Sequence, residues 1–373
     1  MKKTVVVAMS GGVDSSVAAL LLKREGYRVI GITMQIWPQS EDKAKACCSL
    51  EAVNDARRVA WKLEIPYYVM NFRQEFEDKV IDHFCNEYLR GRTPNPCIEC
   101  NRHLKFDALL RKARGLGADF IATGHYVRKE YDDKTQQWVL KTGINETKDQ
   151  SYALYHLTQD QLTHTLFPLG KYCKADVRQI ASREGLAVAQ KAESQDICFV
   201  EGTAGDFIEM YRQLQDIGQG NIIDAEGNLI GQHKGIYHYT VGQHKGLGLA
   251  LGFPVYVTAI DAETNTVRVG RKEELFSSGL LAENVHLISS VSPELLQNIS
   301  VKIRYNAPKV SAAVNLLHDG TAEVAFTEKQ RAVTPGQAVV FYDGDHVLGG
   351  GAIRSALQSK GFTAMREVRE IQK

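Results

Sequence analysis

Residues 10–15 read Ser-Gly-Gly-Val-Asp-Ser and stand between a short β-branched strand pattern and a helix pattern. Gly11 and Gly12 let the backbone turn tightly and approach a bound group closely. The N–H groups and the dipole of the following helix offer positive partial charge to an anion. The segment, here called the phosphate loop, therefore predicts a cradle for nucleotide phosphates, although it matches neither the Walker A nor the G-x-G-x-x-G pattern. The alternative is a plain glycine-rich turn in which Asp14 caps the helix.

Three cysteines stand where thiol chemistry is favoured: Cys97, Cys100 and Cys198. Cys97 and Cys100 form a C-x-x-C pair before a helix pattern, with Cys100 or Asn101 as the expected N-cap. A thiol near a helix N-terminus has a lowered pKa because the dipole favours the thiolate. Residues 86–115 carry seven Arg or Lys against three Asp or Glu. This positive charge favours both a thiolate and a phosphate-bearing partner.

The remaining cysteines suit structural roles. Cys85 and Cys173 lie in helical patterns and are predicted to be small core residues. Cys47 and Cys48 follow a polar loop, where a structural role is favoured over a reactive one. A structural zinc site at C-x-x-C is disfavoured because no second C-x-x-C or H-x-x-H completes it. An odd total of seven cysteines in a long chain also argues against a disulfide framework.

Strand and helix patterns alternate along the first half of the chain. Strands are predicted at residues 4–9, 28–36, 67–72 and 119–123, and helices at residues 14–25, 51–63, 75–89 and 101–114. Such alternation predicts an α/β fold with a Rossmann-like parallel sheet covered on both faces. The phosphate loop is the first turn of that sheet, where nucleotides bind.

The second half of the chain has a different pattern of predicted secondary structure. A hairpin is predicted over residues 126–142 and a helix over residues 174–184. Short alternating runs follow at residues 254–260, 266–269, 301–305, 312–316, 322–326 and 338–342. They predict a small mixed or β-rich domain and then a C-terminal β-barrel. We expect a catalytic domain over residues 1–203, a central domain over 204–277 and a barrel over 278–373.

Composition excludes several classes of protein. The chain has 373 residues, 44% hydrophobic and 24% charged, which is typical of a globular protein of two or three domains. With 45 basic and 44 acidic residues, neither charge-driven disorder nor a uniformly basic nucleic-acid coat protein is expected. No run of 18 apolar residues is present, and the apolar run near Met1 is too short for a signal peptide. We therefore expect a cytoplasmic protein without a membrane span.

An ordered set of motifs carries a family resemblance. The phosphate loop resembles the pyrophosphate loop of the ATP-pyrophosphatase superfamily, whose members split ATP into AMP and pyrophosphate and adenylate a substrate oxygen. The whole set resembles the tRNA-specific 2-thiouridylases, up to about residue 355. It comprises SGGVDSS at 10–16, TPNPxxxCN at 93–101, ATGHY at 122–126, KDQSY at 148–152, SQDICF at 194–199, GxYxYTxGQxxGLG at 235–248 and RY at 304–305.

The resemblance implies ATP-dependent 2-thiolation of the wobble uridine in tRNA, with Mg²⁺ and a persulfide-carrying sulfur-donor protein as partner. It implies that Cys100 is the nucleophile and that Cys198 carries the persulfide intermediate. The implied ATP contacts are Ala8, Met9, Ser10, Gly11, Gly12, Val13, Asp14, Ser15, Met34 and Gly124. The implied contacts to the target base are Asn95, Pro96 and Cys97, and other implied tRNA contacts are His125, Lys148, Asp149, Gln150, Arg304, Tyr305 and Gln337.

Position 97 departs from a common form of the family pattern. Many members have Asp where this chain has Cys97, and a neutral thiol is a poorer acceptor or proton carrier than a carboxylate. Two versions of the chemistry follow. A metal-free persulfide relay needs only Cys100 and Cys198, whereas an iron–sulfur cluster with one open iron would take Cys97, Cys100 and Cys198 as ligands.

Two other functions remain open on the residues alone. One is a different pyrophosphate-loop ligase that adenylates a small metabolite, which needs neither two separated thiols nor a β-rich RNA-binding half. The other is a metal-binding RNA-binding module that senses nucleotide without consuming it. Release of AMP and pyrophosphate with and without tRNA distinguishes all three.

Overall fold

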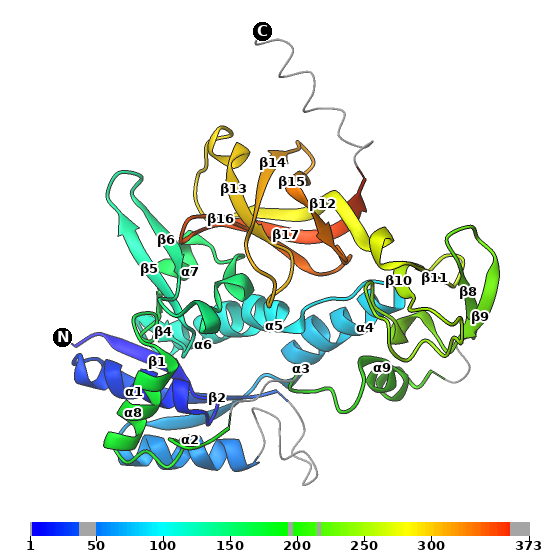
Figure 1. The fold of residues 1–373 in the computed structure, drawn as a ribbon. Coiled ribbons are helices and arrows are strands. Elements are labelled where there is room, and N and C mark those ends of the chain that lie inside the picture. Colours follow the sequence, from blue (N-terminus) through cyan, green and yellow to red (C-terminus); the bar gives the residue numbers. More distant parts are fainter. Residues whose placement is uncertain (1, 37–49, 193–196, 215–217, 359–373) are drawn as a thin grey trace. The chain divides into compact units, whose positions relative to one another are not determined.

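The computed structural model describes residues 2–36, 50–192, 197–214 and 218–358 (Figure 1). The chain divides into two compact units. The first comprises residues 1–82, 96–200 and 345–348, and the second comprises residues 83–95, 201–344 and 349–373. The predictions for Cys47 and Cys48, and those for residues 194–196 of the SQDICF motif, lie outside the described residues.

A parallel five-stranded sheet forms the centre of the first unit, in the order β3-β2-β1-β4-β7. Its strands are β1 (Thr4–Ala8), β2 (Arg28–Gln35), β3 (Tyr67–Asn71), β4 (Phe120–Ala122) and β7 (Thr165–Leu166). Strand β1 pairs with β2 on one side and with β4 on the other. The chain order reverses at β1, so the carboxyl ends of β1 and β4 flank the switch point at which such sheets bind ligands.

Helices cover both faces of this sheet (Figure 1). Helices α1 (Val13–Arg24), α2 (Leu50–Lys62) and α8 (Lys174–Arg183) share one hydrophobic cluster with Val5 and Val7 of β1. On the other face, α6 (Leu109–Gly115) packs against β4. The prediction of a doubly covered α/β sheet is confirmed.

The helix that carries the C-x-x-C pair begins earlier than predicted. It runs without a break through α5 (Pro96–Glu99), the π-helix η2 (Cys100–Ala108) and α6. The prediction that Cys100 or Asn101 is the N-cap is therefore wrong, since both residues lie inside the helix. Pro96 is well suited to the first helical position, where the missing N–H costs no hydrogen bond. The predicted helix over 75–89 similarly consists of α3 (Arg73–Phe76), the π-helix η1 (Glu77–Ile81) and α4 (Asp82–Leu89).

The predicted hairpin is also present in the first unit. Strands β5 (Val127–Asp132) and β6 (Gln137–Thr142) pair antiparallel, and β6 pairs further with His346 and Val347. Three short helices follow it, η3 (Glu146–Lys148), η4 (Ser151–Leu154) and α7 (Gln159–Thr163). This segment matters for the site because η3 and η4 flank Asp149 and Gln150.

The second unit contains a small mixed sheet. After α9 (Ala204–Arg212), strands β8 (Gly220–Ile223), β9 (Leu229–His233), β10 (Tyr256–Asp261) and β11 (Thr266–Gly270) pair in the order β10-β11-β8-β9. The pairing of β8 with β11 is parallel and the others are antiparallel. The turn η5 (Ile236–His238) contributes Ile236 to the core of this sheet.

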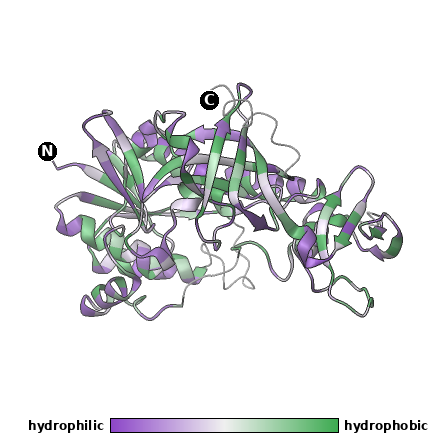
Figure 2. Ribbon diagram, turned by 45° about the horizontal axis from the view of Figure 1, so that its top comes forward, coloured by the Kyte–Doolittle hydropathy of each residue, from purple (hydrophilic) through white to green (hydrophobic). Residues whose placement is uncertain are grey.

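A closed antiparallel barrel follows in the same unit. Its strands are β12 (Phe276–Leu287), β13 (Ile299–Lys302), β14 (Val310–Leu316), β15 (Ala322–Arg331), β16 (Ala338–Asp343) and β17 (His346–Leu357). Pairing of β12 with β17 closes it. Hydrophobic and hydrophilic segments alternate along these strands (Figure 2). The predicted order of an α/β domain, a mixed domain and a barrel is confirmed, and none of the described helices is long and apolar enough to cross a membrane.

Two cysteines outside the site gave different outcomes. Cys85 is fully buried in α4, so its predicted core position is confirmed. Cys173 is half-buried at the N-cap of α8, where its N–H donates to Asp176 Oδ2 at 2.9 Å. The prediction of a core residue is wrong for Cys173 because it precedes the helix rather than lying on its buried face.

Candidate functional site

A pocket of about 350 Å³ lies within the first unit, beyond the carboxyl ends of β1, β2 and β4. We call it the thiol pocket. It brings together the phosphate loop, the turn after β4, the start of the helix that begins at Pro96, and the segment around Cys198. The predicted site residues that line it are Ala8, Met9, Ser10, Asp14, Ser15, Met34, Pro96, Cys97, Cys100, Gly124, His125, Gln150 and Cys198.

The phosphate loop is held by its own hydrogen bonds and by close packing. The Ser10 N–H donates to Ser15 Oγ at 3.2 Å, and Ser16 Oγ donates to the Gly12 carbonyl at 2.8 Å. Gly11 has φ +70°, and a Cβ there would lie 2.2 Å from the carbonyl oxygen of Ala52 in α2. Gly11 therefore meets both a backbone and a steric requirement for glycine. Gly12 and Val13 form the N-cap and the first residue of α1.

Asp14 does not cap the helix, because the N-cap is Gly12. Its carboxylate lines the pocket from the first turn of α1. It accepts from Tyr126 Oη at 2.6 Å and from Lys174 Nζ at 2.7 and 2.8 Å. The first turn of a helix favours a negative charge. Asp14 is thus a carboxylate beside the loop that is held in place by Tyr126 and paired with the positive charge of Lys174.

The turn after β4 carries a buried histidine. The Nδ1 atom of His125 lies 2.8 Å from Thr123 Oγ1. Burial, and secondly the positive charge of Lys105, hold the pKa of His125 well below its usual value. The ring is therefore neutral near pH 7 and offers hydrogen bonds rather than charge. Gly124 lets this turn approach α1, since a Cβ there would lie 2.8 Å from the Ser15 nitrogen.

The three thiols reach the pocket from different parts of the chain. Cys97 is exposed in the first turn of α5, Cys100 is half-buried at the start of η2, and Cys198 is half-buried. In the described structure they do not form a site for a single metal ion. Among the described residues, the group of His, Cys, Asp and Glu ligand atoms that lie within 4.8 Å of one another is Asp206, Glu209 and His238. Within the described residues, the three thiols are therefore not arranged to share one metal ion.

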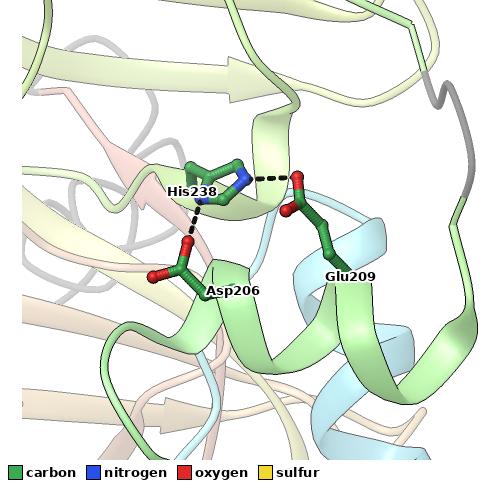
Figure 3. A group of neighbouring side chains, drawn as sticks. All are labelled: Asp206, Glu209 and His238. Carbon is green, nitrogen blue, oxygen red and sulfur yellow. Dashed lines mark hydrogen bonds and ion pairs between the residues drawn. The ribbon is translucent and has the colours of Figure 1, made fainter.

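The Asp206, Glu209 and His238 group lies in the second unit, on α9 and η5 (Figure 3). His238 Nε2 lies 2.8 Å from Glu209 Oε1, and its Nδ1 lies 4.0 Å from Asp206 Oδ1. Glu209 also accepts from Tyr237 Oη at 3.1 Å. Burial, and secondly this bond to Glu209, raise the pKa of Tyr237 to about 12. Lys234 Nζ lies 3.8 Å from Asp206. A cation is thus already supplied by the chain, and we interpret the group as an ion-pair network that fixes α9 against η5.

The predicted tRNA contacts at the KDQSY motif have internal partners. The Asp149 carboxylate is buried and accepts from the N–H of Gly143 at 3.1 Å and from Ser151 Oγ at 2.7 Å. Gln150 Oε1 accepts from the Tyr126 N–H at 3.0 Å. These bonds join the motif to the hairpin β5–β6. Lys148 is half-buried at the end of η3.

The predicted contacts in the second unit also differ in their surroundings. Arg304 donates to the carbonyls of Val241 at 3.2 Å and Ala332 at 2.8 Å. Gln337 donates to the Thr93 carbonyl at 2.7 Å, two residues before Asn95. Tyr305 is 37% exposed and is accessible to a partner. Through these hydrogen bonds, Arg304 and Gln337 also connect segments of the second unit. A role in RNA contact remains a prediction for Arg304, Tyr305 and Gln337.

Lys105 and Thr123 line the pocket but were not singled out from the sequence. From the sequence, Lys105 was one of the seven basic residues of the stretch 86–115 and had no role of its own. Lys105 is five positions after Cys100, and in an α-helix this spacing places the two side chains about 140° apart around the helix axis. The π-helical geometry that brings both to one pocket has no signal in the hydrophobic pattern.

Known families and proteins match the sequence of this chain over nearly its whole length. The family described as the tRNA methyl transferase HUP domain matches residues 3–202, its PRC-barrel domain matches residues 205–271, and the aminomethyltransferase beta-barrel domain matches residues 277–353. The tRNA-specific 2-thiouridylase MnmA of Acetivibrio thermocellus is 53% identical over 95% of this chain and 99% of its own. The protein of that name from Moorella thermoacetica is 54% identical over 95% of this chain and 100% of its own.

A solved 4-thiouridine synthetase–RNA complex with bound ATP is more distant. It has a TM-score of 0.36 and 17% identity, and the match covers 53% of this chain and 45% of that one. Family membership rests instead on the sequence matches, which extend over nearly the full length of both chains. The chain belongs to the tRNA-specific 2-thiouridylase family.

Proposed function

We propose that this chain is an ATP-dependent tRNA-uridine 2-sulfurtransferase that replaces the C2 oxygen of the wobble uridine by sulfur. The observation that carries the proposal is the thiol pocket, in which Cys100, Cys198 and the phosphate loop line one cavity. A reaction that joins ATP activation to sulfur transfer needs these groups together. Because its substrate is tRNA, we expect the enzyme to work in the cytoplasm.

Methyl transfer, which the domain descriptions name, is the second candidate. It would use a methyl donor and would need neither a pyrophosphate loop nor a pair of thiols. The lining of the pocket supplies both. Sulfur transfer therefore accounts for more of the pocket than methyl transfer does.

The first step activates an oxygen that is otherwise a poor leaving group. The uridine O2 attacks the α-phosphorus of ATP, the bond to the pyrophosphate breaks, and an adenylated base results. The phosphate loop would hold the phosphates through backbone N–H groups and the hydroxyls of Ser10 and Ser15. Met34 and Gly124 would contact the rest of the nucleotide. Bound with the nucleotide, Mg²⁺ would supply positive charge to the phosphates. Asp14 is the acidic side chain of the described lining, and it would have to give up its ion pair with Lys174 to hold the metal.

The second step transfers sulfur without a metal. A sulfur-donor protein loads Cys198 as a persulfide. The Cys100 thiolate attacks Cys198 Sγ, a Cys100–Cys198 disulfide forms, and the terminal sulfur leaves as hydrosulfide. Hydrosulfide attacks C2 of the adenylated base and AMP departs with the original oxygen. A dithiol reductant then restores both thiols.

The target base must leave its stack to reach the pocket, as base-modifying enzymes generally require. Asn95, Pro96 and Cys97 would contact the base, and neutral His125 and Gln150 would offer hydrogen bonds. Lys148 and Tyr305 have the charge and the ring that RNA phosphates and bases favour. Asp149, Arg304 and Gln337 would support the same surfaces through the internal bonds described above.

Product analysis tests the proposal. We expect AMP and pyrophosphate to be released in equal amounts only when unmodified tRNA, ATP and a persulfide donor are present, with 2-thiouridine formed in the tRNA. A control reaction with S-adenosylmethionine in place of ATP should leave the tRNA unmethylated. AMP release on a small acceptor without tRNA would identify a metabolite ligase. Binding of tRNA without AMP release would identify a binding module.

Affinity for tRNA should depend on salt. Neutralised phosphates release counterions, so we expect the dissociation constant to rise by at least about tenfold between 50 and 200 mM monovalent salt. Filter binding or fluorescence anisotropy with an unmodified transcript measures it. A flat response over this range would count against an RNA substrate.

A further inference from the structure

Lys105 is the cationic side chain of the thiol pocket. The ionisable residues among the described lining are Asp14, Cys97, Cys100, Lys105, His125 and Cys198. Asp14 is neutralised by Lys174, and His125 is neutral because of its burial. Within the described lining, the positive charge therefore comes from Lys105 alone. Its ammonium is close enough to His125 to oppose protonation of that ring.

The π-helix brings Lys105 to the side of Cys100. Both residues belong to η2, and they are five positions apart. In a π-helix the hydrogen bonds run from i to i+5, so these two residues lie nearly above one another. Helical side chains lean toward the N-terminus and cover the preceding turn. The Lys105 side chain therefore leans toward the turn that holds Cys100.

We infer that Lys105 is a positioning residue that holds Cys100 as the thiolate. The inference rests on the proposed function, in which that thiolate attacks the persulfide. An ammonium beside a thiol favours the charged form of sulfur. Since Cys100 does not lie at the N-terminus of its helix, a nearby cation is a better source of stabilisation than the helix dipole.

The other groups that line the pocket leave this task to Lys105. Phe76 and Val80, from α3 and η1, line the pocket and are apolar, which by itself would raise the pKa of a thiol. On the helix that carries Cys100, Arg102 Nη1 and His103 Nε2 each lie 3.2 Å from a carboxylate oxygen of Glu99. Gln150 and Thr123 add uncharged polar groups.

The pH dependence of Cys100 alkylation tests the inference. A Cys97→Ser background leaves Cys100 as the cysteine of its tryptic peptide, residues 93–102, so mass spectrometry follows it alone. We expect half-maximal iodoacetamide reactivity below pH ~8.5, the value of an ordinary thiol. In Lys105→Met the rate near pH 7 should fall about tenfold, equivalent to one pKa unit. Lys105→Arg should keep the rate within about threefold of the parent because the charge is retained.

Lys134→Met, in the exposed turn between β5 and β6, is the matched control for loss of one positive charge, and it should leave the alkylation profile unchanged. The inference is overturned if Cys100 in the parent titrates at or above pH ~8.5, which needs no variant that must fold. It is also overturned if Lys105→Met leaves the profile unchanged and weakens only ATP binding, which would assign the ammonium to the phosphates. Because alkylation requires neither ATP nor tRNA, a shifted profile in a chain that does not thiolate tRNA would contradict only the proposed function.

Discussion

Replacing Gly11 by valine is expected to abolish ATP-dependent AMP formation, with a loss of about a hundredfold or more. Gly11 has φ +70°, which a β-branched residue adopts only with strain, and its Cβ would lie 2.2 Å from the Ala52 carbonyl oxygen. The loop would have to move away from α2, and the N–H groups would no longer converge on the phosphates. Pyrophosphate release measures the step, and equilibrium dialysis measures ATP binding.

Gly26→Val is the matched control for this variant. Gly26 also has a positive φ, +90°, but nothing lies within 4 Å of its Cβ. It follows α1 and lies outside the thiol pocket. This variant carries the same backbone strain and side chain, so it should lose stability while keeping the rate of AMP formation per folded molecule. Near-normal AMP formation in Gly11→Val would remove the phosphate loop from the mechanism.

The parallel sheet could be predicted from the sequence because its signals are local. Strands β1 and β4 are short apolar runs, and β1 has Val5, Val6 and Val7 fully buried. On α2, Val53, Ala56 and Ala60 recur with the helical period and are buried as expected. The phosphate loop was predicted for the same reason, since a turn after a buried strand is read from adjacent residues.

Strands β12 and β17 of the barrel were missed because non-local pairing determines them. Strand β17 contains Gly349 and Gly351, which weaken a strand pattern in a single sequence. In the barrel they are required: a Cβ at Gly349 would lie 2.1 Å from the His286 carbonyl, and one at Gly351 2.8 Å from the Glu283 carbonyl, both in β12. The glycines that allow β12 and β17 to pair closely are therefore also the residues that weaken the strand pattern of β17 in the sequence.

The hydrogen-bond partners of the site residues could likewise not be predicted from local sequence patterns. The motif that contains Asp149 marked a functional segment, but the sequence could not show that Gly143 and Ser151 bind its carboxylate. The same holds for Lys105, which depends on π-helical geometry. Residue types could be predicted for the site, whereas the hydrogen bonds that orient them arise from tertiary contacts.

Replacing Cys100 or Cys198 by serine is expected to abolish 2-thiouridine formation, by at least about a thousandfold, as for loss of a nucleophile in other enzymes. Serine carries no persulfide, and its hydroxyl is not ionised near neutral pH. ATP binding should persist, because the phosphate loop is untouched. Mass spectrometry of digested tRNA measures the product. Cys173→Ser is the matched control and should keep full activity, since Cys173 is the N-cap of α8 and serine is well suited to that position.

Cys97→Ser then distinguishes the two versions of the chemistry. In the metal-free relay both essential sulfurs remain, so this variant should retain substantial thiolation. Any loss of activity should come from weaker contact between residue 97 and the target base. An iron–sulfur mechanism loses a ligand, so Cys97→Ser would be as inactive as Cys100→Ser. Full thiolation by Cys198→Ser would exclude both versions, because neither can proceed without that sulfur.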